Sequence, residues 1–121
     1  MIRLATLQVL ITSILLSNNN HPIILVHGFL GWGKEEVGDK SYWGGENDIE
    51  KYLNDRGFQV YSVSLGPVSS TYDCAIETFY QIKGGQVDYG QEHSEKYKII
   101  RKPEGKIYKG LYPEWNEENP V

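Results

Sequence analysis

Hydrophobic residues form one short continuous run near the start of the chain. Ile23 to Val26 are all aliphatic and lie between Pro22 and Gly28. A continuous run of this length is typical of a strand covered on both faces, as in a parallel sheet, whereas a half-exposed strand would alternate apolar and polar residues. We therefore predict a buried strand over 23–26.

The next segment, 46–56, has helical periodicity. Apolar residues recur at i, i+3 and i+4 from Ile49 onward. Asn47, followed three residues later by Glu50, is a variant of the capping box that begins many helices. Gly57 then supplies the usual C-terminal stop.

A second strand and a second helix follow. Residues 58–65 are rich in β-branched and aromatic side chains, which favours a strand. We predict a helix over 70–83 that ends before Gly84. Its predicted stripe consists of Tyr72, Ile76, Phe79, Tyr80 and Lys83.

Beyond residue 86 the pattern weakens, because Gly, Pro and charged residues are interleaved. We predict mostly loop there, with only 98–100 hinting at order. The sequence holds no internal repeat, so the order strand, helix, strand, helix remains. This order predicts an α/β fold with parallel strands alternating with helices.

Composition narrows the class of protein. The chain has 121 residues, enough for a single domain, and 40% of them are hydrophobic. Nine Tyr and three Trp mean that buried rings will need hydrogen-bond partners. The net charge is −4 and the basic residues are scattered, so we predict no nucleic-acid partner.

The N-terminus has the pattern of a targeting segment. Arg3 precedes a mostly apolar run from Leu4 to Leu16 and then a run of Asn, as in a secretory signal peptide. The run is too short to span about 30 Å of hydrocarbon, so we expect no stable membrane anchor. A signal peptide over 1–18 predicts a secreted protein folded over 19–121. An ordinary buried first helix is the alternative, because no small-residue cleavage pattern precedes the Asn run.

The turn after the first strand, "HGFLGWG", contains three glycines, which have no side chain to cover the backbone amides. Amides at the carboxyl end of a parallel strand can bind an anion. The glycines run G-x-x-G-x-G from Gly28 to Gly33, and no GK[ST] follows, so a nucleotide phosphate is disfavoured. An oxyanion hole for ester attack fits better. A tight turn that only packs is the alternative.

Several stretches together point to one family. They are "PIILVHGFLGWG" (22–33), "YWGG" with "DIEKYLNDRGFQVY" (42–61), "GPVSSTYDCA" (66–75), "KGGQVDYGQEHSEKY" (83–97) and "YKGLYPEW" (108–115). The chain resembles the secreted triacylglycerol lipases of the staphylococcal and thermophilic bacillus type, which have the α/β-hydrolase fold. The resemblance implies that the Phe29 backbone N–H supplies half of the oxyanion hole. It also implies that His27 fixes the turn, because the family's catalytic base lies far downstream.

The resemblance further implies a zinc site. Asp73 and His93 stand where the family has the first Asp and the first His of a two-Asp, two-His site. The second His position falls on Ile99, and the second Asp would lie beyond the chain, so the site is incomplete here. Without the resemblance, Asp73 is a first-turn helix residue favoured by the dipole and His93 a solvated loop histidine. Cys74, the only cysteine, cannot form an internal disulfide and is expected in the core.

The catalytic serine is not in the sequence. No G-x-S-x-G motif occurs in the 121 residues; the resemblance places it shortly after Val121. We therefore expect the N-terminal half of an α/β-hydrolase, incomplete, poorly stable and inactive alone, whose full-length form hydrolyses lipid or other carboxylic esters. A secreted non-catalytic protein that binds lipid or carbohydrate is the alternative. Complementation by a separately encoded half has no sequence feature in its favour.

Overall fold

The computed structural model describes residues 20–33, 36–38 and 40–121. The predicted signal peptide over 1–18 lies outside these residues. The elements, in chain order, are β1 (Ile23–Leu25), α2 (Ile49–Asn54), β2 (Val60–Ser62), α3 (Thr71–Lys83), β3 (Gly85–Gln86), α4 (Gln91–Tyr97) and β4 (Ile107–Tyr108).

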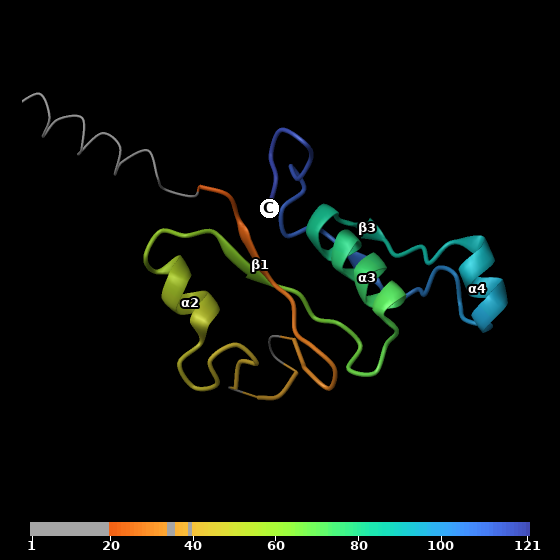
Figure 1. Ribbon diagram of the computed structural model, residues 1–121, viewed down its shortest axis with the longest axis horizontal. Helices are drawn as coiled ribbons and strands as arrows, with labels where there is room; N and C mark the ends of the chain where they lie inside the picture. The colour runs from red at the N-terminus through yellow and green to blue at the C-terminus, as the bar shows by residue number, and fades with distance from the viewer. Residues whose placement is uncertain (1–19, 34–35, 39) are drawn as a thin grey trace, which may run out of the picture.

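The two predicted strands pair in parallel. Ile23 is aligned with Val60 and Leu25 with Ser62. The connection between them contains α2, and Figure 1 shows α2 and α3 lying to either side of the β1–β2 pair. The prediction of parallel strands alternating with helices is confirmed.

The prediction that the first strand is covered on both faces is wrong for the described residues. All three residues of β1 are only half-buried, and Val26 is 44% exposed. Within the described ranges, β2 is the only strand that pairs with β1, so the second edge of β1 has no strand beside it. The aliphatic sequence of β1, which is typical of a buried strand, is therefore partly exposed to solvent.

The helix α2 is shorter than predicted and is capped one residue later. Asp48, rather than Asn47, is the N-cap: its Oδ1 accepts the Lys51 backbone N–H at 3.0 Å. The predicted stop is confirmed, because Gly57 has φ +89° and its N–H donates to the Asn54 carbonyl oxygen. The left-handed conformation of Gly57 is the one that ends many helices.

The helix α3 lies where the sequence predicts it, but it buries another face. The Ser70 hydroxyl caps its first turn by accepting the Asp73 N–H at 3.1 Å. Of the predicted stripe, Tyr72 and Phe79 are about half exposed. The fully buried residues are Glu77, Gln81 and Ile82.

The prediction of mostly loop beyond residue 86 is confirmed, but the sequence pattern did not predict the two elements that the segment contains. These are α4 and β4, and Ile107 of β4 is aligned with Gln86 of β3 in an antiparallel pair. The helix α4 has no apolar stripe, since only Ser94 is buried along it. Lys98 is its left-handed C-cap rather than the start of another element.

The buried apolar residues lie between β2, α3 and the segment after β3. They are Val60, Val63, Leu65, Ile82, Val87 and Tyr89. Among the described residues, no helix has the length and apolar character needed to cross a membrane.

Candidate functional site

The His27 ring joins the end of β1 to the segment after β2. Its Nε2 accepts the Leu65 backbone N–H at 3.0 Å, and its Nδ1 lies 3.1 Å from the Gly28 carbonyl oxygen. Because an N–H can only donate and a carbonyl can only accept, the ring carries its proton on Nδ1. His27 is 6% exposed and fixes the turn, as the sequence predicts.

Two glycines of the turn are required by close approach to other residues. A Cβ at Gly31 would lie 2.5 Å from His27 Nδ1, and a Cβ at Gly33 would overlap the Ser64 side chain. Any other residue would force the turn away from these neighbours. The bare backbone thus lets the turn fold back onto His27 and Ser64.

The Phe29 backbone N–H has no hydrogen-bond partner among the described residues. The amides that follow it are fixed: Leu30 N–H donates to Pro67 O at 2.8 Å and Gly31 N–H to Gly28 O at 2.9 Å. Leu30 has φ +58°, which a branched side chain rarely adopts. Such strain persists where surrounding bonds impose it, and it is common at functional sites.

A pocket of about 310 Å³ lies beside this turn. His27, Gly28 and Phe29 form one part of its lining. The rest is Leu65, Gly66, Pro67, Ser69, Thr71 and Cys74. Cys74 is therefore half-buried at a pocket wall and not a full core residue, so that prediction is only partly correct. Burial, aided by nearby carboxylates, raises the pKa of its thiol, which makes it a poor nucleophile.

Asp73 and His93 are brought together by α3 and α4. Asp73 Oδ1 lies 2.9 Å from His93 Nε2, and Asp73 Oδ2 accepts the Ser70 hydroxyl at 2.8 Å. The His93 ring stacks on Tyr72 at 4.0 Å and contacts Tyr97 at 4.7 Å between centroids. The His93 side chain is 14% exposed and lies on a helix, so its interpretation as a solvated loop histidine is wrong.

These residues do not make a complete metal site. A structural zinc ion takes four ligands, whereas Asp73 and His93 supply two that hydrogen-bond to each other, and Ile99 offers none. In the part of the chain that the structure describes, no group of three or more His, Cys, Asp or Glu residues could hold a metal. Zinc binding at Asp73 and His93 stays a prediction.

A buried charged cluster holds α3 to the β3–β4 pair. Glu77, 2% exposed, accepts the Tyr89 hydroxyl at 2.6 Å and the Lys106 ammonium at 2.5 Å. Burial and the Glu77 carboxylate raise the pKa of Tyr89 to about 12. Burial alone would lower the pKa of Lys106, but its bonds to Glu77 and Tyr89 outweigh this and raise it.

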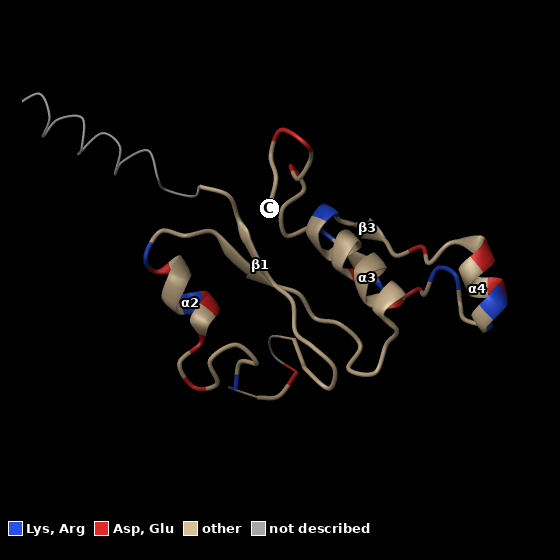
Figure 2. Ribbon diagram, viewed as in Figure 1, with Lys and Arg blue, Asp and Glu red and all other residues tan. Residues whose placement is uncertain are grey.

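Asp88 anchors the start of α4. Its Oδ1 accepts Arg101 Nε at 2.7 Å and the Gly90 N–H at 2.9 Å, and its Oδ2 accepts Arg101 Nη2 at 2.8 Å. The Arg101 guanidinium and the Gly90 amide hold the pKa of Asp88 well below its ordinary value. Figure 2 shows basic and acidic residues interspersed on α2 and α4. The absence of a nucleic-acid partner stays a prediction.

Comparison with known proteins decides the family. A family model described as "Lipase-like, C-terminal domain" matches residues 19–121. The chain belongs to this lipase-like family. It is 44% identical over 101 residues to a lipase of Staphylococcus epidermidis and 42% identical over 110 residues to lipase 2 of Staphylococcus aureus. The resemblance to staphylococcal lipases is confirmed.

Solved structures agree with this assignment. Lipase 1 from Pelosinus fermentans has a TM-score of 0.78 at 47% identity, and Staphylococcus hyicus lipase has 0.79 at 37% identity; each comparison covers 86% of this chain and 27% of the other. EstA from Clostridium botulinum has a TM-score of 0.80 at 44% identity over 85% of this chain and 24% of the other.

The lipase-like chain spans a minor part of its relatives. The match to the Staphylococcus epidermidis lipase covers 80% of this chain but 14% of that lipase. The match to lipase 2 of Staphylococcus aureus covers 85% of this chain but 15% of that protein. Similarity alone therefore does not transfer the activity and substrates of those longer proteins to this chain.

Sequence reasoning missed the polar partners of this lipase-like turn. The Tyr42 ring lies 5.6 Å from the His27 ring, and Glu36 accepts the Gly33 N–H at 3.1 Å and the Ser64 hydroxyl. The Ser64 hydroxyl, followed by the Gly33 amide, lowers the pKa of Glu36 despite the cost of burial. No local pattern marks the contacts of Tyr42 with His27 or of Glu36 with Ser64, because each joins residues far apart in the sequence.

Proposed function

We propose that this chain is the part of a serine-type carboxylic ester hydrolase, acting on acylglycerols, that supplies the first oxyanion-hole donor. The observation that carries the proposal is the Phe29 backbone N–H. It lacks a partner among the described residues, and Phe29 lines the pocket beside the turn. A buried, satisfied amide would give no reason to expect ligand binding.

The surroundings of Phe29 suit this chemistry. When a nucleophile attacks an ester carbonyl, negative charge develops on the carbonyl oxygen, and donors already in position stabilise it without reorganising. The bonds from Leu30 to Pro67 and from Leu65 to His27 fix the turn on both sides of the Phe29 amide. The donor is thus held by the fold rather than by the substrate.

The remaining catalytic groups are not in this sequence. It contains no G-x-S-x-G elbow, so the nucleophile and the acid and base that follow it in α/β-hydrolases would come from elsewhere. We propose that the chain forms the N-terminal half of an α/β-hydrolase fold and is inactive alone. The parallel β1–β2 pair with alternating helices supports this placement. The apolar N-terminal run supports secretion.

A chimera tests the proposal. Residues 23–115 replace the aligned segment of the Pelosinus fermentans lipase, and hydrolysis of 4-nitrophenyl butyrate is measured beside the 121-residue chain. We expect turnover by the chimera and only the buffer rate for the chain. A folded chimera without turnover, or turnover by the chain itself, would contradict the proposal. Binding of triacylglycerol or sugar by an inactive but folded chimera would favour the non-catalytic alternative.

A further inference from the structure

The strand β2 turns one edge toward β1 and the other away from it. The Ile23 N–H donates to Gln59 O at 2.8 Å, and the Val63 N–H donates to Leu25 O at 3.1 Å. Backbone polar groups alternate between the two edges of a strand. The residues whose N–H and C=O groups face the outer edge are therefore Val60, Ser62 and Ser64.

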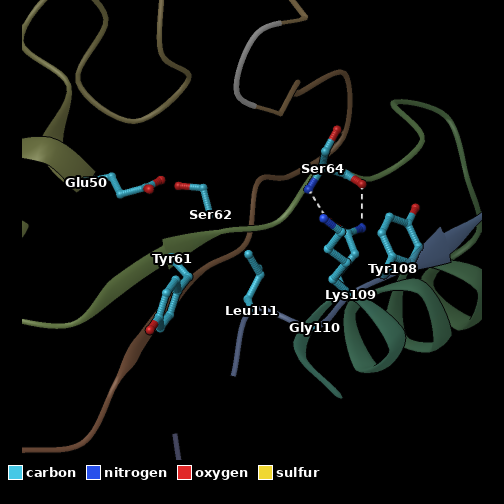
Figure 3. Close-up of a pocket in the computed structure, with 9 residues that line it drawn as sticks. Glu50, Tyr61, Ser62, Ser64, Tyr108, Lys109, Gly110 and Leu111 are labelled. Carbon is cyan, nitrogen blue, oxygen red and sulfur yellow. Dashed lines mark hydrogen bonds between the residues drawn. The ribbon is translucent and has the colours of Figure 1, made fainter. Parts of the chain in front are cut away.

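Side-chain carboxamides occupy two of these three positions. Asn54 of α2 accepts the Val60 N–H at 3.1 Å and donates to Val60 O at 2.9 Å. Gln81 of α3 accepts the Ser64 N–H at 2.8 Å and donates to Ser64 O at 2.6 Å. Dashed lines mark the hydrogen bonds at Ser64 in Figure 3. Each carboxamide fills the place of a neighbouring strand.

Ser62, between these two positions, lacks such a partner. Among the described residues, none hydrogen-bonds to its outward N–H or C=O, and its Oγ is buried without a partner. Ser62 lines a pocket of about 360 Å³ between α2, β2 and residues 108–111 (Figure 3). Unpaired polar groups at a partly buried strand edge cost stability, so an occupant is expected.

We propose that this gap binds one primary carboxamide or a small cis-lactam. Such a group presents N–H and C=O on the same side, so it can accept the Ser62 N–H and donate to Ser62 O, as Asn54 and Gln81 do for their neighbours. A trans peptide unit presents them on opposite sides and cannot make both bonds with one residue. Because Asn54 and Gln81 occupy the flanking positions, a whole strand cannot pair along this edge.

Part of the remaining lining suits a short alkyl group attached to the amide. Tyr61, Tyr108 and Leu111 supply apolar surface beside Ser62, while Glu50 and Lys109 also line the pocket. The pocket is of the size that holds small organic ligands. It shares no lining residue with the pocket at Phe29, so the proposed binding does not depend on ester hydrolysis.

Isobutyramide is the probe, titrated into the ¹⁵N-labelled 121-residue chain. We expect a saturable shift of the Ser62 amide resonance with a millimolar dissociation constant, as suits a ligand of few atoms. The trans amide N-methylisobutyramide has the same acyl group and is expected to give no saturable shift. Equal shifts with both amides, or none with either, would overturn the proposal.

Two variants separate the backbone pair from the side chain. Ser62→Ala keeps the N–H and C=O and should bind isobutyramide within about threefold of the parent, whereas Ser62→Pro loses the N–H and should bind at least about tenfold more weakly. Proline is tolerated where a strand N–H faces away from the sheet. Retained binding by Ser62→Pro would contradict the proposal.

Removal of Gln81 supplies a test that does not depend on a change at Ser62. Gln81→Ala opens a second gap of the same kind at Ser64, so isobutyramide should raise the Tm of this variant more than that of the parent chain. The N-methyl amide should not do so. An equal effect of the two amides on this variant would show that the edge does not select syn amide groups.

Discussion

The region around the turn after β1 and the region of α3 and α4 are held by different contacts. In the first, side chains bind mainly backbone groups: His27 accepts the Leu65 N–H, Asn54 pairs with Val60, and Glu36 accepts the Gly33 N–H. In the second, charged side chains bind each other across long sequence separations, as Lys106 binds Glu77 and Arg101 binds Asp88.

This difference has a functional meaning. Satisfying backbone groups one at a time leaves selected amides, such as that of Phe29, open to a ligand. In the second region, side-chain ion pairs hold short elements such as α4 against the rest of the fold, because these elements bury little apolar surface of their own. We therefore expect ligand effects to concentrate in the first region and effects of pH in the second.

Loss of Glu77 should have the largest effect. Glu77→Ala leaves Lys106 and Tyr89 without their carboxylate, and breaking a buried ion pair costs about 3 kcal/mol of unfolding free energy. Urea denaturation measures this. Lys51→Ala, which breaks the exposed Lys51–Asp55 pair, is the control and should change the free energy of unfolding much less. Equal losses would show that burial of the cluster is unimportant.

Replacement of His27 should come next. His27→Phe keeps the ring but leaves the Leu65 N–H without an acceptor, at a cost of about 2 kcal/mol. The Leu65 amide should also exchange its hydrogen faster. If the free energy of unfolding is unchanged, His27 does not fix the turn.

An alkaline titration should weaken the second region. The folded-state pKa of Tyr89 is raised to about 12 from its ordinary 10.0, so its contribution is complete below pH 10 and is lost as the pH rises toward 12. We expect a loss of about 1 kcal/mol, measured as the pH dependence of urea unfolding. Tyr89→Phe should reduce this alkaline loss of unfolding free energy. An identical loss in the variant would show that other groups cause it.

The smallest effect should come from acid. The pKa of Asp88 is lowered in the fold, so its contribution is present above the ordinary value of 3.8 and is lost as the pH falls through the folded value. Because Asp88 anchors α4, the protection of the amides in residues 91–97 relative to their intrinsic exchange rates should fall in acid, and Asp88→Asn should remove most of this change. A uniform change across all helices would contradict the assignment.

The sequence predicts the first region better than the second. Local patterns and turn residues mark β1, α2 and β2, even though the cap of α2 is one residue off, and of the second region they mark only the bounds of α3. Neither α4 nor β4 has an apolar period, and their contacts, such as Glu77 to Lys106, link residues 29 apart. The buried face of α3 was missed because it carries the polar residues Glu77 and Gln81, which resemble a solvated surface until their partners are known.

The candidate site was predictable where a motif carries it. The Asp73–His93 contact and the unpartnered Phe29 amide lie in stretches that resemble the lipases. The gap at Ser62 leaves no trace in the sequence, because it depends on which edge of β2 the carboxamides of Asn54 and Gln81 reach.

Replacing the Phe29 peptide N–H by an ester oxygen in the active chimera tests the central claim most directly. The change removes one donor and keeps the side chain. The account predicts that kcat falls about 10²- to 10³-fold with little change in KM, because the donor acts on charge that develops only in the transition state. The same replacement at Leu30, which breaks its bond to Pro67, should lower Tm instead. An unchanged kcat in a folded Phe29 variant would contradict the account.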